Sequence, residues 1–321
     1  MPNPRPFTVD PVLTGIAIGY RNSSQSLIAD QVLPRTPVLG ETFKWLEYPL
    51  AEGFTLPDTR VGRRGRVNRV EFSATERSGS VHDYGLDNEI PQTDIDAAAA
   101  QRRAGRSNYD PENHAAESLT NLIMLDREVR VAGLIQDPAS YAPERRVVLA
   151  ASDRFDDYEN SDPIEVIKEA IQKTLIYRPN TMVMGMGVWS KLSSHPALVN
   201  AIRGNLTNKG IISRDEFKNL FEIKDLLIGE SFVNTARKGQ SVSLQRTWGN
   251  SIELLHIDPM ARADDGRITF GLTAQLGNKI AGRMEDPNIG LKGGRIVRVG
   301  EQVEELIIAR DVGVIIQNAI S

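Results

Sequence analysis

The sequence predicts a protein of the α+β class, and three stretches of the chain carry that prediction. Residues 110–136 form the longest helical pattern, residues 162–233 alternate between helix and strand patterns, and residues from 267 onward give strand patterns only. A long helix, a mixed layer and a run of strands together exclude a purely helical or a purely β architecture. We therefore expect one long helix between sheet-containing units.

Length and charge allow a sizeable core and argue against a surface built to hold nucleic acid. The chain has 321 residues, with 38 Lys and Arg against 42 Asp and Glu, so its formal net charge is −4. It has no cysteine, which excludes disulfides, thiolate metal sites and cysteine nucleophiles. No signal-peptide pattern and no apolar run long enough for a membrane span is present. We expect a cytoplasmic protein with no membrane contact.

The first forty residues are predicted to form an arm that lies on another surface. The prolines of MPNPRPF disfavour regular structure, DPVLTGIAIGYRN fits one short helix, and IADQVLPRTPVLGE is extended and interrupted by Pro34 and Pro37. These residues supply little core of their own.

The next segment predicts a long two-stranded flap with a basic tip. Residues 43–49 and 67–75 alternate as strands do, and the residues between them are rich in Gly, Pro and Arg. The flap arginines are Arg60, Arg63, Arg64, Arg66 and Arg69. Either they are solvated, or they pair with carboxylates on a neighbouring subunit. Nucleic-acid contact ranks third, because no aromatic residue is interleaved with them to stack bases.

The helix predicted over 110–136 has clear start and stop signals. Asp110 is a good N-cap, Pro111 suits the first turn, and Asp137-Pro138 ends the pattern. Apolar residues recur at steps of three or four, while Glu117, Asp126, Arg127 and Arg130 are expected on the remaining, polar face. At 1.5 Å per residue the helix would be about 40 Å long, which is typical of a structural spine.

The other elements follow from periodicity and turn residues. We expect a strand ending at Pro91 followed by a short helix or ordered loop, and a strand over 145–151. Helices are predicted after Asp162-Pro163, on both sides of Pro196, and after Ser213, where Glu216 completes a capping box. Strands are predicted in TMVMGM, DLLIGESFVN and NSIELLHID, and then in RITFGLTAQL, KIAGRME, GGRIVRVG, EELIIARD and VGVIIQNAI, with turns at Asp264–Gly266 and Gly293-Gly294.

No motif supports catalysis or metal binding. The four histidines, His82, His114, His195 and His256, do not have metal-ligand spacing. Gly185 and Gly187 follow a predicted strand as in a dinucleotide loop, but Ser190 replaces the third glycine, and a turn that packs Trp189 explains them equally well. Asp156, Asp157 and Glu159 could hold a hard cation, but a solvated loop or a partner of the flap arginines accounts for them better. We predict no catalytic, cofactor-binding or metal-binding residue, and no enzyme.

The ordered set of elements resembles the major capsid proteins of tailed bacteriophages, which have the Hong Kong 97-type (HK97-type) shell fold. The resemblance spans essentially the whole chain. Its local matches are NTMVMGMGVWSKLSSHPALVNAI, ISRDEFKNLFEIKDLLIGESFVNTA and VRVGEQVEELIIARDVGVIIQNAI. No single motif is diagnostic, and the order of the set carries the resemblance.

The resemblance implies four regions. They are an N-terminal arm at 1–40, an extended β-hairpin loop at 41–76, a peripheral domain at 77–159 and 263–305 with the spine helix 110–136, and an axial α/β domain at 160–262 and 306–321. The flap arginines would contact a neighbouring subunit, with Asp156, Asp157 and Glu159 as candidate acidic partners.

It also implies a function and a set of partners. The chain would form pentamers and hexamers of an icosahedral virion shell around double-stranded DNA, without sequence-specific binding and without a cofactor. A portal protein, and scaffold or decoration proteins where they exist, would be further partners, and assembly would take place in the cytoplasm of a bacterial host. The slightly acidic composition suits DNA packing, because a strongly cationic inner wall would adhere to phosphates.

Two departures from the family pattern have consequences. Some relatives join subunits covalently through a loop lysine, but residues 49–76 contain none and Lys44 is the nearest, so we expect no cross-link. The arm begins almost at Met1, which predicts a separate scaffold protein or none.

Three alternatives remain open from the sequence. An encapsulin-like nanocompartment would use the same fold around protein cargo. An enzyme would use the α/β layer with a ligand near Gly185 and Gly187, and would need a pocket with convergent polar groups. A nucleic-acid-binding protein would use Arg60 to Arg69 and would bind DNA in a salt-dependent way.

Overall fold

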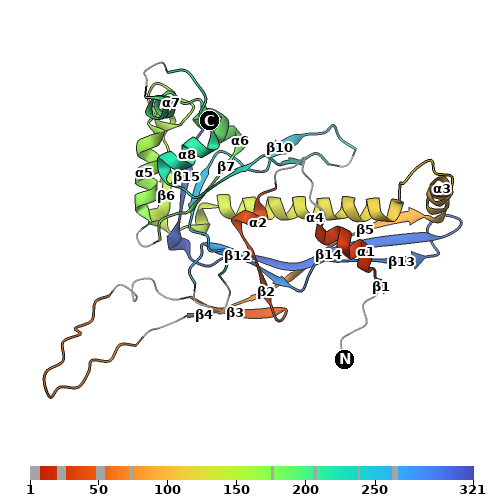
Figure 1. The fold of residues 1–321 in the computed structure, drawn as a ribbon, viewed down its shortest axis with the longest axis horizontal. Helices are drawn as coiled ribbons and strands as arrows, with labels where there is room; N and C mark the ends of the chain where they lie inside the picture. Colours follow the sequence, from red (N-terminus) through yellow and green to blue (C-terminus); the bar gives the residue numbers. More distant parts are fainter. Residues whose placement is uncertain are drawn as a thin grey trace.

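The chain folds around one long helix that connects two larger β-sheets (Figure 1). The computed structural model describes residues 8–19, 27–47, 55–71, 75–174, 177–204, 208–237, 239–261 and 267–321. The first seven residues and the turn predicted at Asp264–Gly266 lie outside the described residues. None of the described helices is long and apolar enough to cross a membrane.

The first sheet has six strands and is centred on one 14-residue strand, β14. Its order is β1-β13-β14-β12-β2, and β5 pairs with β14 along the other edge. All pairings are antiparallel except β2 with β12. The strands are β1 Thr8–Val9, β2 Arg35–Val38, β5 His82–Pro91, β12 Gly271–Leu276, β13 Ile280–Asp286 and β14 Gly294–Ile307.

Helix α4, Pro111–Gln136, lies along this sheet and confirms the predicted spine. The Asp110 side chain accepts a hydrogen bond from the backbone N–H of Glu112 at 3.0 Å, as an N-cap does. The Glu112 carboxylate in turn accepts from Arg283 at 2.8 Å and from Arg295 at 2.5 Å. These two ion pairs hold the first turn of α4 against β13 and β14.

The second sheet has five strands in the order β6-β15-β11-β7-β8. Helices α5, α6, α7 and α8 cover one of its faces, and α4 closes the other. The α8 capping box between Ser213 and Glu216 is confirmed. The elements are β6 Arg146–Val148, β7 Thr181–Gly185, β8 Asp225–Gly229, β11 Ile252–Leu255, β15 Gly313–Gln317, α5 Pro163–Lys173, α6 Met186–Ser193, α7 Pro196–Arg203 and α8 Arg214–Phe221.

Smaller elements decorate this framework. Two short hairpins pair β3 with β4 and β9 with β10, and both project from the body (Figure 1). The remaining elements are α1 Pro11–Gly19, α2 Ala29–Val32, β3 Thr42–Glu47, β4 Thr75–Ser80, α3 Gln92–Arg103, β9 Phe232–Asn234, β10 Leu244–Arg246 and short 3₁₀ turns at Pro138–Ser140, Pro143–Arg145, Ala151–Asp153 and Arg310–Val312.

Three strand predictions were wrong. DLLIGESFVN is not one strand, because it divides into β8 of the five-stranded sheet and β9 of a separate hairpin. The second flap strand is β4 at Thr75–Ser80 and not residues 67–75; of those, 72–74 lie outside the described residues and 67–71 are exposed without a strand partner. β-branched residues favour strands where they pack on a half-buried surface, which is missing here. The expected break between GGRIVRVG and EELIIARD does not exist, because Gly300 pairs with both Gly85 and Ile280 inside the continuous β14.

The arm also differs from its prediction, because its described parts pack on their own chain. Leu13 and Ala17 of α1 are buried against the first half of α4, and Val32 and Leu33 are buried against the second half. The arm therefore contributes to the core of its own chain.

Glu253 on β11 is a buried carboxyl group that faces the core closed by α4. Its side chain is 1% exposed, its neighbours across the sheet are Val183 and Ile315, and one carboxyl oxygen has no hydrogen-bond partner among the described residues. Burial raises its pKa to about 8, although a hydrogen bond from Ser251 opposes the shift. The fold therefore binds a proton at Glu253 that the unfolded chain releases near its ordinary value of 4.5.

We expect this carboxyl group to make the folded chain less stable as the pH rises. Stability that is fully present below pH 4.5 is lost as the pH rises towards about 8, by about 1 kcal/mol per pH unit. Glu253→Gln should remove this slope, so its unfolding free energy relative to wild type should increase between pH 5 and 8. Urea unfolding at several pH values measures the difference between the two proteins. Groups that titrate alike in both proteins, such as His195, do not contribute to this difference. Parallel pH profiles for the two proteins would contradict the prediction.

Candidate functional site

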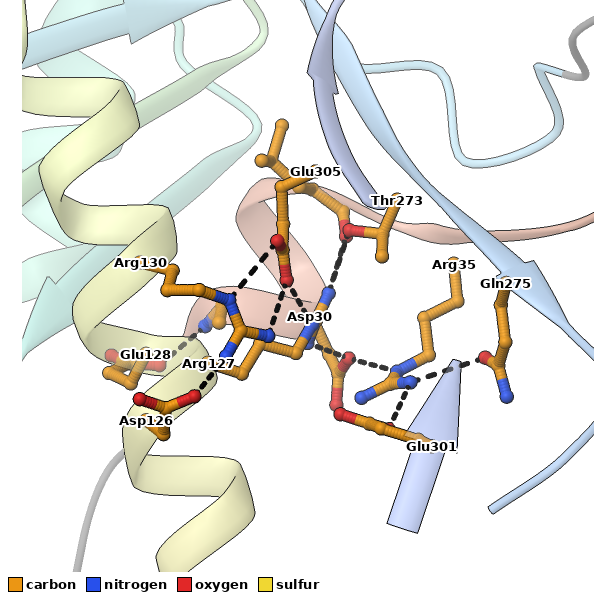
Figure 2. A network of polar contacts seen from close by, with 12 residues as sticks. Asp30, Arg35, Asp126, Arg127, Glu128, Arg130, Thr273, Gln275, Glu301 and Glu305 are labelled. Carbon is orange, nitrogen blue, oxygen red and sulfur yellow. Dashed lines mark hydrogen bonds and ion pairs between the residues drawn. The ribbon is translucent and has the colours of Figure 1, made fainter. Parts of the chain in front are cut away.

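A network of charged side chains attaches the arm to the body, and we call it the arm seam (Figure 2); Arg127 and Glu301 are buried in it, whereas 53% of the Asp30 side chain is exposed. It joins the arm residues Asp30 and Arg35 to side chains of α4, β12 and β14. Arg127 of α4 lies at its centre, with 2% of its side chain exposed. It pairs with Asp30 and donates hydrogen bonds to the Leu33 carbonyl at 3.1 Å and the Thr273 hydroxyl at 2.9 Å.

Arg35 and Arg130 extend the arm seam on either side of Arg127. Arg35 pairs with Asp30 at 2.7 Å and with the buried carboxylate of Glu301 at 2.7 Å. Arg130 pairs with Glu305 at 3.0 Å, and its guanidinium lies 3.7 Å from the centre of the Tyr84 ring. Glu301 and Glu305 of the arm seam thus each face at least one guanidinium, as buried charges require.

The pKa shifts follow from this pairing. Burial alone would raise the pKa of Asp30, but Arg127 and Arg35 lower it below its ordinary value. Burial likewise opposes the charged form of Arg35, yet Glu301 and Asp30 raise its pKa. For Arg127 burial outweighs the carboxylates and lowers the pKa. The network therefore depends on all its members being present together.

Glu128, the residue after Arg127, makes a second connection to the arm. It is fully buried and accepts hydrogen bonds from the backbone N–H groups of Ile28 at 3.1 Å and Ala29 at 2.8 Å, and from the Trp248 indole at 2.7 Å. Burial raises its pKa, while these three donors oppose the shift. One carboxylate thus joins α4, the start of α2 and the turn before β11.

Trp248 reaches Glu128 because Gly229 leaves room for the indole. A Cβ built on Gly229 would lie 1.9 Å from the Trp248 ring, which is closer than any real contact. Sequence patterns missed the arm seam, since Arg127 was predicted on the polar face of the helix and that prediction was wrong. The available signal was spacing, because Arg127 lies four residues after the buried Ile123 and Glu128 lies three before the buried Val131.

The flap arginines lie apart from the arm seam, on a segment that extends away from the body (Figure 1). Residues 55–71 are all exposed, and the side chains of Arg60, Arg63, Arg64, Arg66 and Arg69 form no ion pair within the described residues. Their own order comes from short-range contacts, such as the turn in which Gly65 N–H bonds the Gly62 carbonyl at 2.8 Å. The flap therefore presents its charges outward.

The predicted acidic partners lie on the loop before α5, and the described structure shows no contact between them and the flap of the same chain. Asp156 accepts hydrogen bonds from the backbone and hydroxyl of Ser321, which lower its pKa. Asp157 accepts from the side chain and backbone of Asn160, and its pKa is lowered too. Glu159 is exposed, and its carboxylate forms no hydrogen bond or ion pair within the described residues.

The described residues contain no group of three metal-ligating side chains. His195 instead caps α7, where its Nδ1 accepts from the Ala197 N–H at 3.2 Å and its Nε2 lies 3.0 Å from the Ser161 hydroxyl. Gly185 ends β7, and Trp189 packs into the core against Phe217, which confirms the packing explanation for that turn. Both His195 and Trp189 therefore hold segments of the chain together.

No family model matches the chain, but curated relatives do. It is 44% identical over 316 residues to the major capsid protein of Pseudomonas phage JBD67, and the match covers 98% of both chains. The chain belongs to the phage major capsid protein family. The major capsid protein of Burkholderia phage BcepMu is 32% identical over 317 residues, which are 96% of this chain and 95% of that relative.

Solved structures agree with this capsid protein assignment at the level of the fold. A phage-related protein from Bordetella bronchiseptica has a TM-score of 0.72 at 24% identity over 98% of both chains. The capsid of cyanophage P-SCSP1u has a TM-score of 0.58 at 10% identity over 93% of this chain and 90% of that one. The predicted HK97-type shell fold is confirmed, and this capsid protein is a structural subunit of a virion shell.

Proposed function

We propose that this capsid protein assembles into pentamers and hexamers that close an icosahedral shell around double-stranded DNA. The single observation that carries the proposal is the 44% identity to a phage major capsid protein over 98% of both chains. The exposed flap supports it, because a protruding segment without a core of its own is stabilised by contact with other subunits. Repetition over many interfaces would offset the small contribution of each exposed ion pair, about 0–1 kcal/mol.

The proposed regions are an arm at 1–40, an extended loop at 41–76, a peripheral domain at 77–159 and 263–305, and an axial domain at 160–262 and 306–321. The two larger sheets support this division, with the six-stranded sheet and α4 on one side and the five-stranded sheet on the other. Residues 146–148 pair with β15 in the five-stranded sheet, so they fit the axial domain better than the peripheral one.

The flap arginines are proposed to contact carboxylates of a neighbouring subunit, with Glu159 as the first candidate and Asp156 and Asp157 beside it. Shell assembly would take place in the host cytoplasm, with a portal protein and, where present, scaffold or decoration proteins as further partners. DNA would be enclosed without sequence-specific contacts. No catalytic role is proposed for any residue.

Sedimentation and negative-stain microscopy of the purified chain, with and without the products of its neighbouring genes, test this proposal. Rings of five and six, or closed shells that contain DNA, are the expected result. A protein that stays monomeric or dimeric under all these conditions would overturn it.

A nanocompartment remains the second candidate, because the SrpI encapsulin of Synechococcus elongatus shares the fold with a TM-score of 0.53 at 12% identity. The cargo separates the two functions. Shells purified with protein inside and without nuclease-protected DNA would favour the nanocompartment.

A further inference from the structure

The hairpin of β9 and β10 presents a face that is apolar and basic and that the described chain leaves uncovered. Phe232 pairs with Arg246, and Asn234 pairs with Leu244, so these four side chains share one face. Phe232 is 42% and Leu244 is 63% exposed, and the Arg246 guanidinium lies 4.8 Å from the centre of the Phe232 ring. Val242, close to the tip, is 71% exposed.

This hairpin has too few internal contacts to be stable by itself. It has three residues in each strand, and no other described strand pairs with it. An isolated two-stranded hairpin is marginal in water and needs a surface to pack on. Residues 231–247 contain Arg237, Lys238 and Arg246 but no acidic residue, so a complementary surface would carry carboxylates.

The opposite edge of the five-stranded sheet carries two exposed carboxylates on α5, and the exposed Lys168 lies between them in the sequence. The hairpin follows β8, one edge strand of that sheet, whereas α5 packs over β15, next to the other edge strand β6 (Figure 1). Glu165 and Glu169 lie one turn apart on the exposed side of α5 and have no partner within the described residues. Like charges four residues apart destabilise a helix; Lys168 and Lys173 of the same helix offset part of this repulsion, and a cationic neighbour would offset more of it.

We propose that the β9–β10 hairpin docks on α5 of a second copy of this chain, with Arg237 and Arg246 facing Glu165 and Glu169. A contact that joins opposite edges of one sheet is heterologous, and such contacts form rings when the rotation between neighbouring copies closes. The inference rests on the ring assembly proposed above and specifies one of its interfaces. It is separate from the flap, which leaves the body at another place (Figure 1).

A charge swap tests the docking. Arg237→Glu with Arg246→Glu, and Glu165→Lys with Glu169→Lys, should each raise the protein concentration at which half the chain assembles by about tenfold or more, because like charges then meet at every interface. All four substitutions together should return it towards the wild-type value. Arg237→Lys with Arg246→Lys, which keeps the charge, is the matched control, and thermal unfolding checks that each variant is folded.

The outcomes distinguish a failure of the proposed hairpin interface from a failure of the proposed shell function. Wild-type protein that forms neither rings nor shells would overturn the proposed function itself. Normal assembly of both charge-reversed pairs, or failure of the four-fold variant to recover, would overturn the hairpin interface alone. Shells of the Arg→Glu hairpin variant that assemble normally but retain less DNA would show that the hairpin contacts nucleic acid, and would likewise overturn it.

Discussion

Replacing Glu128 with alanine is expected to lower the free energy of unfolding of the subunit by about 3–5 kcal/mol. The substitution leaves two backbone N–H groups at the start of α2 and the Trp248 indole N–H without their acceptor. Each unsatisfied buried donor costs about 1–3 kcal/mol, and the lost side chain leaves a void beside a fully buried indole.

Unfolding in guanidinium chloride measures this loss of stability, and two further variants serve as comparisons. Glu117→Ala makes the same change at a half-buried site of α4 without a described partner, and should alter stability by no more than about 0.5 kcal/mol. Glu128→Gln retains an acceptor oxygen and should fall between wild type and Glu128→Ala.

The rate of tryptic cleavage tests whether Glu128→Ala loosens the arm. Because Glu128 holds the segment that contains Arg35, tryptic cleavage after Arg35 should be faster in Glu128→Ala than in wild type, where that side chain is 20% exposed. Equal stability of Glu128→Ala and Glu117→Ala, together with equal cleavage rates, would show that Glu128 does not hold the arm.

The elements that could be predicted from the sequence are those whose signals are local. Asp110 and Pro111 start α4, and Ser213 with Glu216 starts α8, because a cap is made by residues within one turn of each other. The contacts that hold the arm instead join residues far apart in the sequence. Arg127 meets Asp30 across 97 positions and Glu128 meets Trp248 across 120. Charged residues on a helix are expected in water, and only such distant partners make their burial favourable.

The flap marks another limit of prediction. Its basic tip is visible in the sequence, and the structure places all five arginines in exposed positions. A single chain cannot show which carboxylates they meet if those belong to another copy. The structure narrows the choice only by showing that Asp156 and Asp157 already bond Ser321 and Asn160.

Replacing Arg63 and Arg64 with glutamate is expected to abolish shell assembly while the subunit stays folded. Both residues lie in the exposed segment 55–71, so the unfolding free energy should change by no more than about 0.5 kcal/mol. At the interface the change is larger, because it turns attraction into repulsion at every copy of a repeated contact. Microscopy and sedimentation measure assembly, and the thermal unfolding midpoint measures folding.

Three further experiments test whether the charge of Arg63 and Arg64 is what shell assembly requires. Arg63→Lys with Arg64→Lys keeps the charge and should still assemble, and wild-type assembly should weaken as salt rises, since exposed pairs are screened. Adding Glu159→Arg to the double glutamate variant should restore part of the shell yield if Glu159 is the partner, because Glu159 has no local contact to lose. Normal shells from the double glutamate variant would exclude the flap arginines from assembly, whereas lost assembly without rescue would place their partner at other carboxylates.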